Sequence, residues 1–242
     1  MLDLPKMIPI EHNIAVTLAR INRAADSHDR KRSTISLLAV SKKQTVEAIQ
    51  TAVAAGLIDF GENYLQEAEQ KIKQLHALNL TWHYIGSIQS NKTQTIARLF
   101  SWVHSVDRIK LARRLSDQRP ADMPPLNICL QVNIDNEEAK SGFDPDHISA
   151  AVTEINRLPR LQLRGLMAIP AQSESEAEQR DSFSRMRILF GSVKDAIESV
   201  NDRASFDTLS MGMSADLESA IAEGATIVRV GTDIFGPRDK LA

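Results

Sequence analysis

Short apolar segments alternate with longer segments of helical periodicity along the chain, and this alternation limits the folds open to it. A parallel neighbour needs a crossover connection, usually a helix, so strict strand–helix alternation predicts a parallel sheet. The expected strands are residues 37–40, 58–60, 82–85, 102–106, 127–132, 162–167, 207–210 and 227–230. The expected helices are residues 45–55, 65–74, 93–100, 109–118, 145–157, 176–200 and 215–223.

About eight strands in 242 residues predict an α/β fold of the (β/α)8, or TIM, barrel type, because such barrels commonly form one unit of about 250 residues. The last strand leaves no room for a helix after it. Residues 9–27, with apolar positions at helical spacing, are expected to complete the outer ring instead. We therefore expect one domain over 1–242, with an N-terminal helical segment at 1–35 and the barrel at about 36–238. An open doubly wound sheet is the alternative.

Composition narrows the functional classes. The 29 basic and 31 acidic residues give a net charge of −2 without a basic block, which predicts no nucleic acid and no membrane as partner. A single cysteine and no signal-like or membrane-spanning segment predict a soluble cytoplasmic protein. The six histidines lack metal-ligand spacing, so no metal is expected.

The fifth expected strand shows which side chains face inward. Ile128, Leu130 and Val132 alternate with Cys129, Gln131 and Asn133. In a barrel the apolar set packs against the helices and the other set faces the lumen. Cys129 is then a buried small residue; a catalytic thiol is the alternative, without a histidine close in sequence to activate it.

Lys42 follows the first apolar strand, at the end where barrels carry their working face. Alternation places Leu38, Val40 and Lys42 on one face and Lys43 on the other. If the first face is the lumen, partial desolvation lowers the pKa of the Lys42 amine, and the neutral amine can attack an aldehyde. Spacing alone leaves open which of the two lysines points inward, and most lysines are solvated surface charges.

Two turns suited to an anion follow the last two expected strands, where barrels commonly bind phosphate. They are Ser210-Met211-Gly212-Met213-Ser214 and Gly231-Thr232. Their glycines let backbone N–H groups approach an anion, and Ser214 is expected to open a helix with free N–H groups and a positive dipole. Ordinary barrel turns are the alternative.

Arg229 interrupts the last apolar strand, where an unpaired buried charge would cost several kcal/mol. Either an internal acid or a ligand must pair with it. A guanidinium beside a pyridine nitrogen disfavours protonation there and weakens the ring as an electron sink. An amine, a phosphate cradle and this cation together predict a protein that binds pyridoxal 5'-phosphate (PLP) but is poorly equipped for its carbanion chemistry.

A series of motifs carries a family resemblance. In order along the chain they are AVSK at 39–42, FGENY at 60–64, WHYIG at 82–86, QSNK at 89–92, QVNI at 131–134, KSG at 140–142, RGLMAIP at 164–170, LSMGMSADLE at 209–218 and VRVGT at 228–232. From about residue 37 to residue 238 the chain closely resembles the pyridoxal phosphate homeostasis (YggS/PROSC) proteins.

The resemblance implies a barrel similar to the N-terminal domain of alanine racemase, with PLP bound to Lys42 as a Schiff base. It also implies phosphate contacts from the turn at 210–214 and from Gly231-Thr232, Arg229 near the pyridine nitrogen, Asn63 and His83 in the pocket, and Lys140 as an auxiliary site. Family members often read Ser-Lys-Thr-Lys-Pro where this chain has Ser-Lys-Lys-Gln-Thr at 41–45, and the tail at 235–242 lacks the basic cluster of some relatives.

Two functional hypotheses remain. One is a non-catalytic PLP binder that serves vitamin B6 and amino-acid homeostasis, and the other is a single-domain amino-acid racemase. Racemases of the resembling fold use a lysine and a tyrosine from a second domain. This chain has only Tyr64 and Tyr84 and ends before such a domain, which favours the binder. The expected partners are PLP and PLP-dependent apoenzymes as recipients, and the protein is expected to be a monomer. A sugar-phosphate enzyme would explain the turns but gives Lys42 and Arg229 no joint role.

Overall fold

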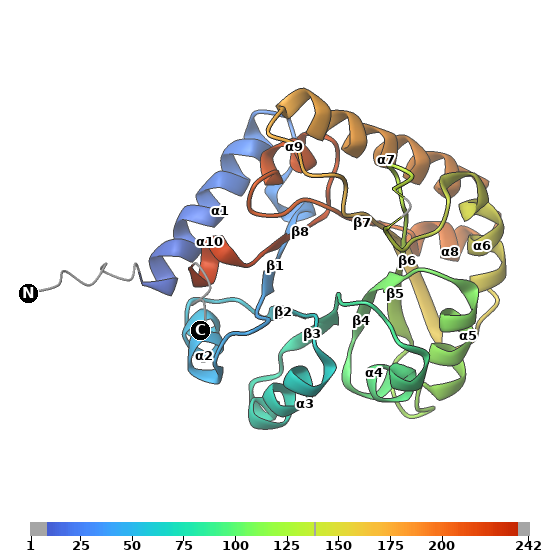
Figure 1. Cartoon of the computed structure of the whole chain (residues 1–242), viewed down its shortest axis with the longest axis horizontal. Coiled ribbons are helices and arrows are strands. Elements are labelled where there is room, and N and C mark those ends of the chain that lie inside the picture. Colours follow the sequence, from blue (N-terminus) through green and yellow to red (C-terminus); the bar gives the residue numbers. More distant parts are fainter. Residues whose placement is uncertain (1–8, 138, 237–242) are drawn as a thin grey trace, which may run out of the picture.

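The strands form a closed parallel barrel. The computed structural model describes residues 9–137 and 139–236. In it each strand pairs with the next and the last pairs with the first (Figure 1). The strands are β1 (Ser36–Val40), β2 (Asp59–Glu62), β3 (Thr81–Tyr84), β4 (Trp102–Val106), β5 (Leu126–Gln131), β6 (Leu161–Met167), β7 (Thr208–Ser210) and β8 (Ile227–Val230). The predicted barrel is confirmed, and the open-sheet alternative is wrong.

Helices surround the barrel in Figure 1. They are α1 (Ile10–Asp26), α2 (Val46–Ala54), α3 (Leu65–Gln74), α4 (Thr93–Leu99), α5 (Ile109–Gln118), α6 (Ile148–Ile155), α7 (Glu176–Ala196), α8 (Val200–Ser205), α9 (Leu217–Ala222) and α10 (Thr232–Phe235). Single 3-10 turns lie at Arg32–Thr34, His76–Leu78, Ser90–Lys92 and Pro145–His147. Within the described ranges, no helix combines the length and the apolar content that a bilayer crossing requires.

The helical segments that follow β6 and β8 differ from the sequence prediction. The helix expected at 176–200 stops at Ala196, and Ser199 starts α8 by accepting a hydrogen bond from the Asp202 N–H. A short α10 follows β8, where none was expected. One helical turn is enough to bury Ile234 completely, which explains why this short segment is ordered as a helix.

The N-terminal helix α1 fills the gap in the outer ring, as predicted. It packs against α2, α9 and α10, which lie beside the first and last strands (Figure 1). Ile14 and Ile21 are buried in this contact, and the Asn13 amide donates to the Ile234 carbonyl at 3.0 Å. The beginning and end of the described chain therefore close the barrel together.

Alternation along the strands separates an outer core from the lumen. Ile128, Leu130 and Val132 belong to the apolar core shared with the helices, as predicted. Burial of one such side chain contributes about 1.5–3 kcal/mol. Cys129 of β5 is fully buried but is not part of that outer core, as expected for a side chain that faces the lumen.

Candidate functional site

The turn after β1 directs Lys42 inward and Lys43 outward. Lys42 lines a narrow cavity of about 20 Å³ together with Val40, Gln44, Gly231, Thr232 and Gly236. The Gln44 N–H donates to the Ser41 carbonyl at 3.0 Å and closes the turn. Lys43 is exposed in the left-handed region at φ 62°, with its Nζ 5.9 Å from the centre of the Tyr64 ring.

Gly231-Thr232 is the predicted anion turn that reaches Lys42. It follows β8, which pairs with β1, so both segments arrive at the same edge of the barrel mouth. A Cβ atom at Gly231 would lie 3.3 Å from the Val40 carbonyl oxygen, so glycine permits the close approach of the two strand ends. Gly231 and Thr232 thereby line the same cavity as Lys42.

The other predicted turn is dominated by packing contacts. Gly212 has φ 90°, and a Cβ there would lie 2.5 Å from the Ala220 Cβ of α9. Met211 is fully buried in the outer core. Glycine at 212 therefore lets α9 pack closely onto the barrel.

The prediction that Ser214 opens a helix is wrong. A turn at 214–216 precedes α9, which begins at Leu217. The Asp216 carboxylate accepts the Met213 N–H at 2.5 Å and so takes one of the donors expected to face an anion. The Ser214 carbonyl accepts from Arg20 of α1 at 3.0 Å.

Arg229 lies in the lumen, in register with Leu38, and is 5% exposed. Its guanidinium donates to the Ser210 Oγ at 2.9 Å and to the Ala168 carbonyl at 3.0 Å. Burial lowers its pKa to about 10, which still leaves it charged at neutral pH. In the part of the chain that the structure describes, no carboxylate lies within ion-pair distance of it, although Asp216 favours its charge from farther away.

A row of polar side chains crosses the lumen from Arg229. The Ser210 Oγ lies 2.8 Å from the His104 Nδ1, and the His104 Nε2 lies 2.9 Å from the His83 Nδ1. The His83 Nε2 lies 3.4 Å from the Asp59 Oδ1. The row therefore links β8, β7, β4, β3 and β2.

The two ends fix the direction of the hydrogen bonds in this row. Burial lowers the pKa of His83 and lowers that of His104 further, so both rings are neutral at pH 7. The Asp59 carboxylate can only accept, which places the His83 proton on Nε2 and leaves its Nδ1 to accept from the His104 Nε2–H. The His104 Nδ1 then accepts from Ser210, which in turn accepts from Arg229. Each group donates to the next, from the buried cation to the carboxylate.

His104 and Asp59 were not among the predicted site residues. The signal for His104 is its position two residues after Trp102, which puts both rings on one face of β4. The His83 ring stacks on Trp102 at 5.4 Å between centres. The inward–outward alternation of side chains, applied to β4 as it was to β5, would have predicted that His104 faces the lumen.

Asn63 directly follows β2 and is half-buried. Its side-chain oxygen is buried and has no hydrogen-bond partner among the described residues. Behind it, a Cβ at Gly86 would lie 2.1 Å from the Asn63 carbonyl oxygen, so the two backbones are in close contact. A buried acceptor of this kind is suited to a donor from a ligand or water.

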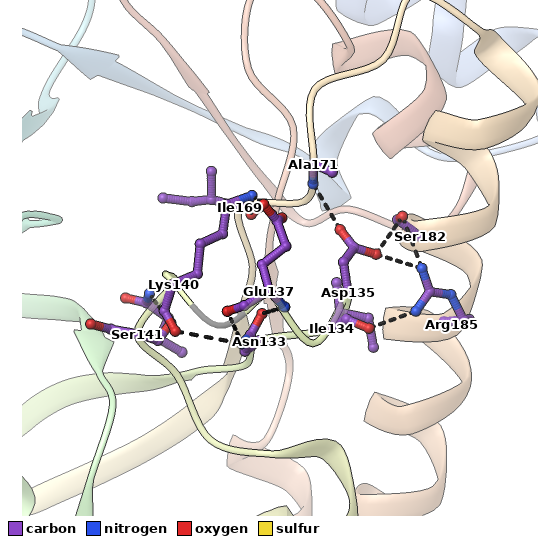
Figure 2. Close-up of polar contacts among 11 residues, drawn as sticks. Asn133, Ile134, Asp135, Glu137, Lys140, Ser141, Ile169, Ala171, Ser182 and Arg185 are labelled. Carbon is purple, nitrogen blue, oxygen red and sulfur yellow. Dashed lines mark hydrogen bonds and ion pairs between the residues drawn. The ribbon is translucent and has the colours of Figure 1, made fainter.

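Lys140 lies apart from Lys42, at a second cavity of about 240 Å³ lined by Ser87, Gln131, Val132, Asn133, Ala139, Lys140, Ser141 and Ile169. Its amine donates to the Ile169 carbonyl at 3.2 Å and forms an ion pair with Glu137 (Figure 2). The Asn133 side chain binds both the N–H and the carbonyl of Glu137 and so shapes the loop. The structure therefore does not bring Lys140 and Lys42 into one cavity.

Asp135 anchors the same loop to α7. Figure 2 shows its carboxylate bound by the Ala171 N–H, the Ser182 hydroxyl and Arg185. Burial would raise the pKa of Asp135, but these hydrogen bonds and the Arg185 charge together lower it. An ionised carboxylate thus ties the loop beside the second cavity to α7.

Cys129 is buried, as predicted, and burial raises the pKa of its thiol to about 12. A thiol with this pKa is not a nucleophile at neutral pH. Across residues 9–137 and 139–236, no three side chains of the metal-binding types are grouped to hold an ion.

The barrel belongs to a known class. The family model for the alanine racemase N-terminal domain matches residues 12–239. An alanine racemase of Corynebacterium glutamicum has the same fold, with a TM-score of 0.68 at 15% identity over 97% of this chain and 63% of that one. The class is therefore the alanine racemase N-terminal domain-like barrel.

Within this class, the chain is 53% identical to the pyridoxal phosphate homeostasis protein of Pseudomonas aeruginosa over 96% of this chain and 97% of that protein. It is 46% identical to the protein of the same name in Escherichia coli, over 96% of this chain and 98% of that one. The structure of PipY from Synechococcus elongatus with PLP bound matches with a TM-score of 0.75 at 36% identity, over 90% of this chain and 100% of that chain. The chain belongs to the pyridoxal phosphate homeostasis protein family, which confirms the predicted resemblance.

Proposed function

We propose that this protein binds PLP at the barrel mouth through Lys42 and serves PLP, and with it vitamin B6 and amino-acid, homeostasis without catalytic turnover. The observation that carries the proposal is that Lys42 lines one cavity with Gly231 and Thr232, at the joined ends of β1 and β8. The relatives' name and the PLP-bound PipY structure support the same ligand.

The residues present suit each part of this ligand. When bound, PLP supplies an aldehyde that condenses reversibly with an amine, and Lys42 is the amine at the cavity. The N–H groups and hydroxyl of Gly231-Thr232 suit the phosphate. Arg229 offers a buried cation without a paired carboxylate in the described residues, and Asn63 offers a buried acceptor without a partner there.

The other residues predicted to contact PLP have more limited roles in this proposal. The turn at 210–214 contributes Ser210, whose hydroxyl joins Arg229 to His104. His83 acts through His104 and orients this row.

The absence of turnover is proposed from the tyrosines and from Arg229. Tyr84 packs on Phe100 and donates to the Ser87 carbonyl at 3.1 Å, and Tyr64 is exposed beside Lys43. Neither tyrosine lines the Lys42 cavity. A charged guanidinium near the ring nitrogen would also weaken the ring as an electron sink. The alternative is a single-domain amino-acid racemase.

We extend the proposal to a cytoplasmic monomer that passes PLP to PLP-dependent apoenzymes and uses Lys140 as an auxiliary site. The balanced charge of the chain supports a protein that contacts neither nucleic acid nor membrane. The polar cavity at Lys140 supports a second, weaker binding position.

The test of the main site is reduction with borohydride in the presence of PLP, followed by peptide mapping. We expect the label on Lys42, and loss of PLP absorbance in Lys42→Ala but not in Lys43→Ala, because Lys43 faces solvent. A label on Lys43, or no label, would contradict the assignment.

The racemase alternative is tested by incubation with L- or D-alanine in deuterated water. We expect no steady exchange of the α-proton, since no second base lines the described Lys42 cavity. Exchange at roughly 1 per second or faster, the range of ordinary enzymes, would overturn the non-catalytic proposal.

A further inference from the structure

A buried cluster lies directly behind the turn that carries Lys42. We name it the Lys71 cluster, consisting of Ser41, Glu62, Glu67 and Lys71. Lys71 of α3 is 5% exposed, and its amine donates to the Ser41 carbonyl at 2.7 Å, to the Glu62 Oε1 at 2.8 Å and to the Glu67 Oε1. An ammonium group has three donors, so each one has an acceptor here.

The cluster grips the chain on both sides of Lys42. On one side, the Ser41 hydroxyl donates to the Glu62 Oε1 at 2.7 Å, while the Ser41 carbonyl is held by Lys71. On the other side, the Lys43 N–H donates to the Glu67 Oε1. The backbone that flanks Lys42 is therefore tied to β2 and α3.

This attachment holds a conformation that the chain does not favour by itself. Lys43 has φ 62°, a region that L-residues with a side chain adopt rarely. In this conformation its N–H donates to Glu67, and its side chain is not among those that line the Lys42 cavity. Without the cluster, the turn can relax and the inward direction of Lys42 is no longer enforced.

We propose that Lys71 is a positioning residue for Lys42: by clamping the turn at 41–44, it makes Lys42 rather than Lys43 the amine that meets a PLP aldehyde. This inference rests on the proposed function, in which Lys42 bonds PLP. Lys71 touches neither the cavity nor the ligand and acts through the backbone.

The sequence contains a signal for this role. Lys71 falls three residues after the buried Ala68 and four before the buried Leu75, so it lies on the core-facing side of α3. A lysine on that side needs acceptors, which Glu62 and Glu67 provide.

The variants must separate positioning from loss of folding. Glu62 is 0% exposed, and its Oε2 has no hydrogen-bond partner among the described residues. Lys71→Met therefore leaves a buried carboxylate uncompensated and is prone to unfold. The double variant Lys71→Met with Glu62→Gln removes the charges of Lys71 and Glu62. Glu67→Gln keeps those two charges and weakens the acceptor that the Lys43 N–H and the Lys71 amine share. Lys73→Met, at an exposed position of the same helix, is the matched control.

Two measurements test the inference. The first is the ratio of borohydride-trapped PLP on Lys42 to that on Lys43. We expect it to fall roughly tenfold in the double variant, as suits the loss of charge-assisted hydrogen bonds, and less in Glu67→Gln. The second, made without PLP, is amide hydrogen exchange at Lys43 and Gln44, which we expect to accelerate in the same variants. Lys73→Met is expected to change neither.

The role of Lys71 would be overturned if the double variant and Glu67→Gln both fold and show the same labelling ratio and the same amide exchange as the unmodified protein. The proposed function would then stand. Absence of label on Lys42 in the unmodified protein would instead remove the proposed function. Faster exchange without a shift in label would show that the cluster holds the turn but does not select the lysine, and would overturn the inference.

Discussion

At the scale of single residues, Arg229 places a charge in the interior of the barrel, where it is almost completely buried. Its neighbours in the described chain are a hydroxyl and a carbonyl, which orient the guanidinium without neutralising it. Such a group is retained at a cost to stability unless a ligand or a hydrogen-bond network uses it. The row of histidines and the proposed PLP ring are the two candidates to do so.

Arg229→Ala tests this residue. We expect PLP retention after gel filtration to fall further in Arg229→Ala than in Arg229→Lys, because lysine keeps a cation in the lumen. The alanine variant should also lose about 1–3 kcal/mol of unfolding free energy, since the Ser210 and Ala168 acceptors lose their donor. Equal retention by the two variants would argue against direct contact between Arg229 and the cofactor.

At the scale of the elements, each strand presents one row to the helices and another to the lumen. The outer row of β5 is apolar, while β3 and β4 put His83 and His104 on the inner side, where they form a hydrogen-bonded row with Ser210. Both imidazoles have a lowered pKa in the folded barrel and the ordinary histidine pKa in the unfolded chain. The free energy of unfolding therefore depends on pH.

The expected direction follows from the lowered pKa of both rings. Below about pH 6.5 the unfolded chain binds protons that the folded barrel does not, so the free energy of unfolding falls on acidification, by at most about 1.4 kcal/mol per pH unit for each histidine. This contribution is fully present above pH 6.5. Urea unfolding between pH 7.5 and 5.5 measures it, and His104→Asn should flatten the slope. The same slope in His104→Asn as in the exposed control His147→Asn would contradict the expectation.

At the scale of the whole molecule, the barrel depends on a helix from its own beginning. α1 seals the gap between α9, α10 and α2, so packing at one end of the sequence supports the joint between β8 and β1. The proposed PLP site lies at that joint. The strands that α1 supports are therefore the strands that carry the proposed site.

Ile21→Ala tests the coupling between α1 and the rest of the barrel. Ile21 is fully buried, so we expect a loss of about 2–5 kcal/mol, against little change for Val16→Ala at an exposed position of the same helix. Tryptophan fluorescence reports on β3 and β4, far from α1 around the barrel, and circular dichroism reports on all helices. The two signals should change in one transition; a separate early transition in one of them would show that α1 unfolds independently.

Much of the site could be predicted because parallel strands end at one edge. That rule brings Lys42 and Gly231-Thr232 together from opposite ends of the sequence. It does not give the detailed geometry of the turn at 210–214, which depends on the packing of Gly212 against α9 and on the hydrogen bond from the Met213 N–H to Asp216. Local spacing contains no information about those contacts.

The sequence by itself determined the barrel, the outer and inner rows of its strands and the role of the first helix, because periodicity and length are local properties with few global solutions. Only the tertiary structure decided which lysine faces inward. That choice depends on one left-handed residue, Lys43, whose N–H donates to Glu67 of α3, and Glu67 in turn binds Lys71 of the same helix. A contact between distant segments cannot be read from spacing. The row from Arg229 to Asp59 is likewise a product of closure, since it needs five strands to meet in one lumen.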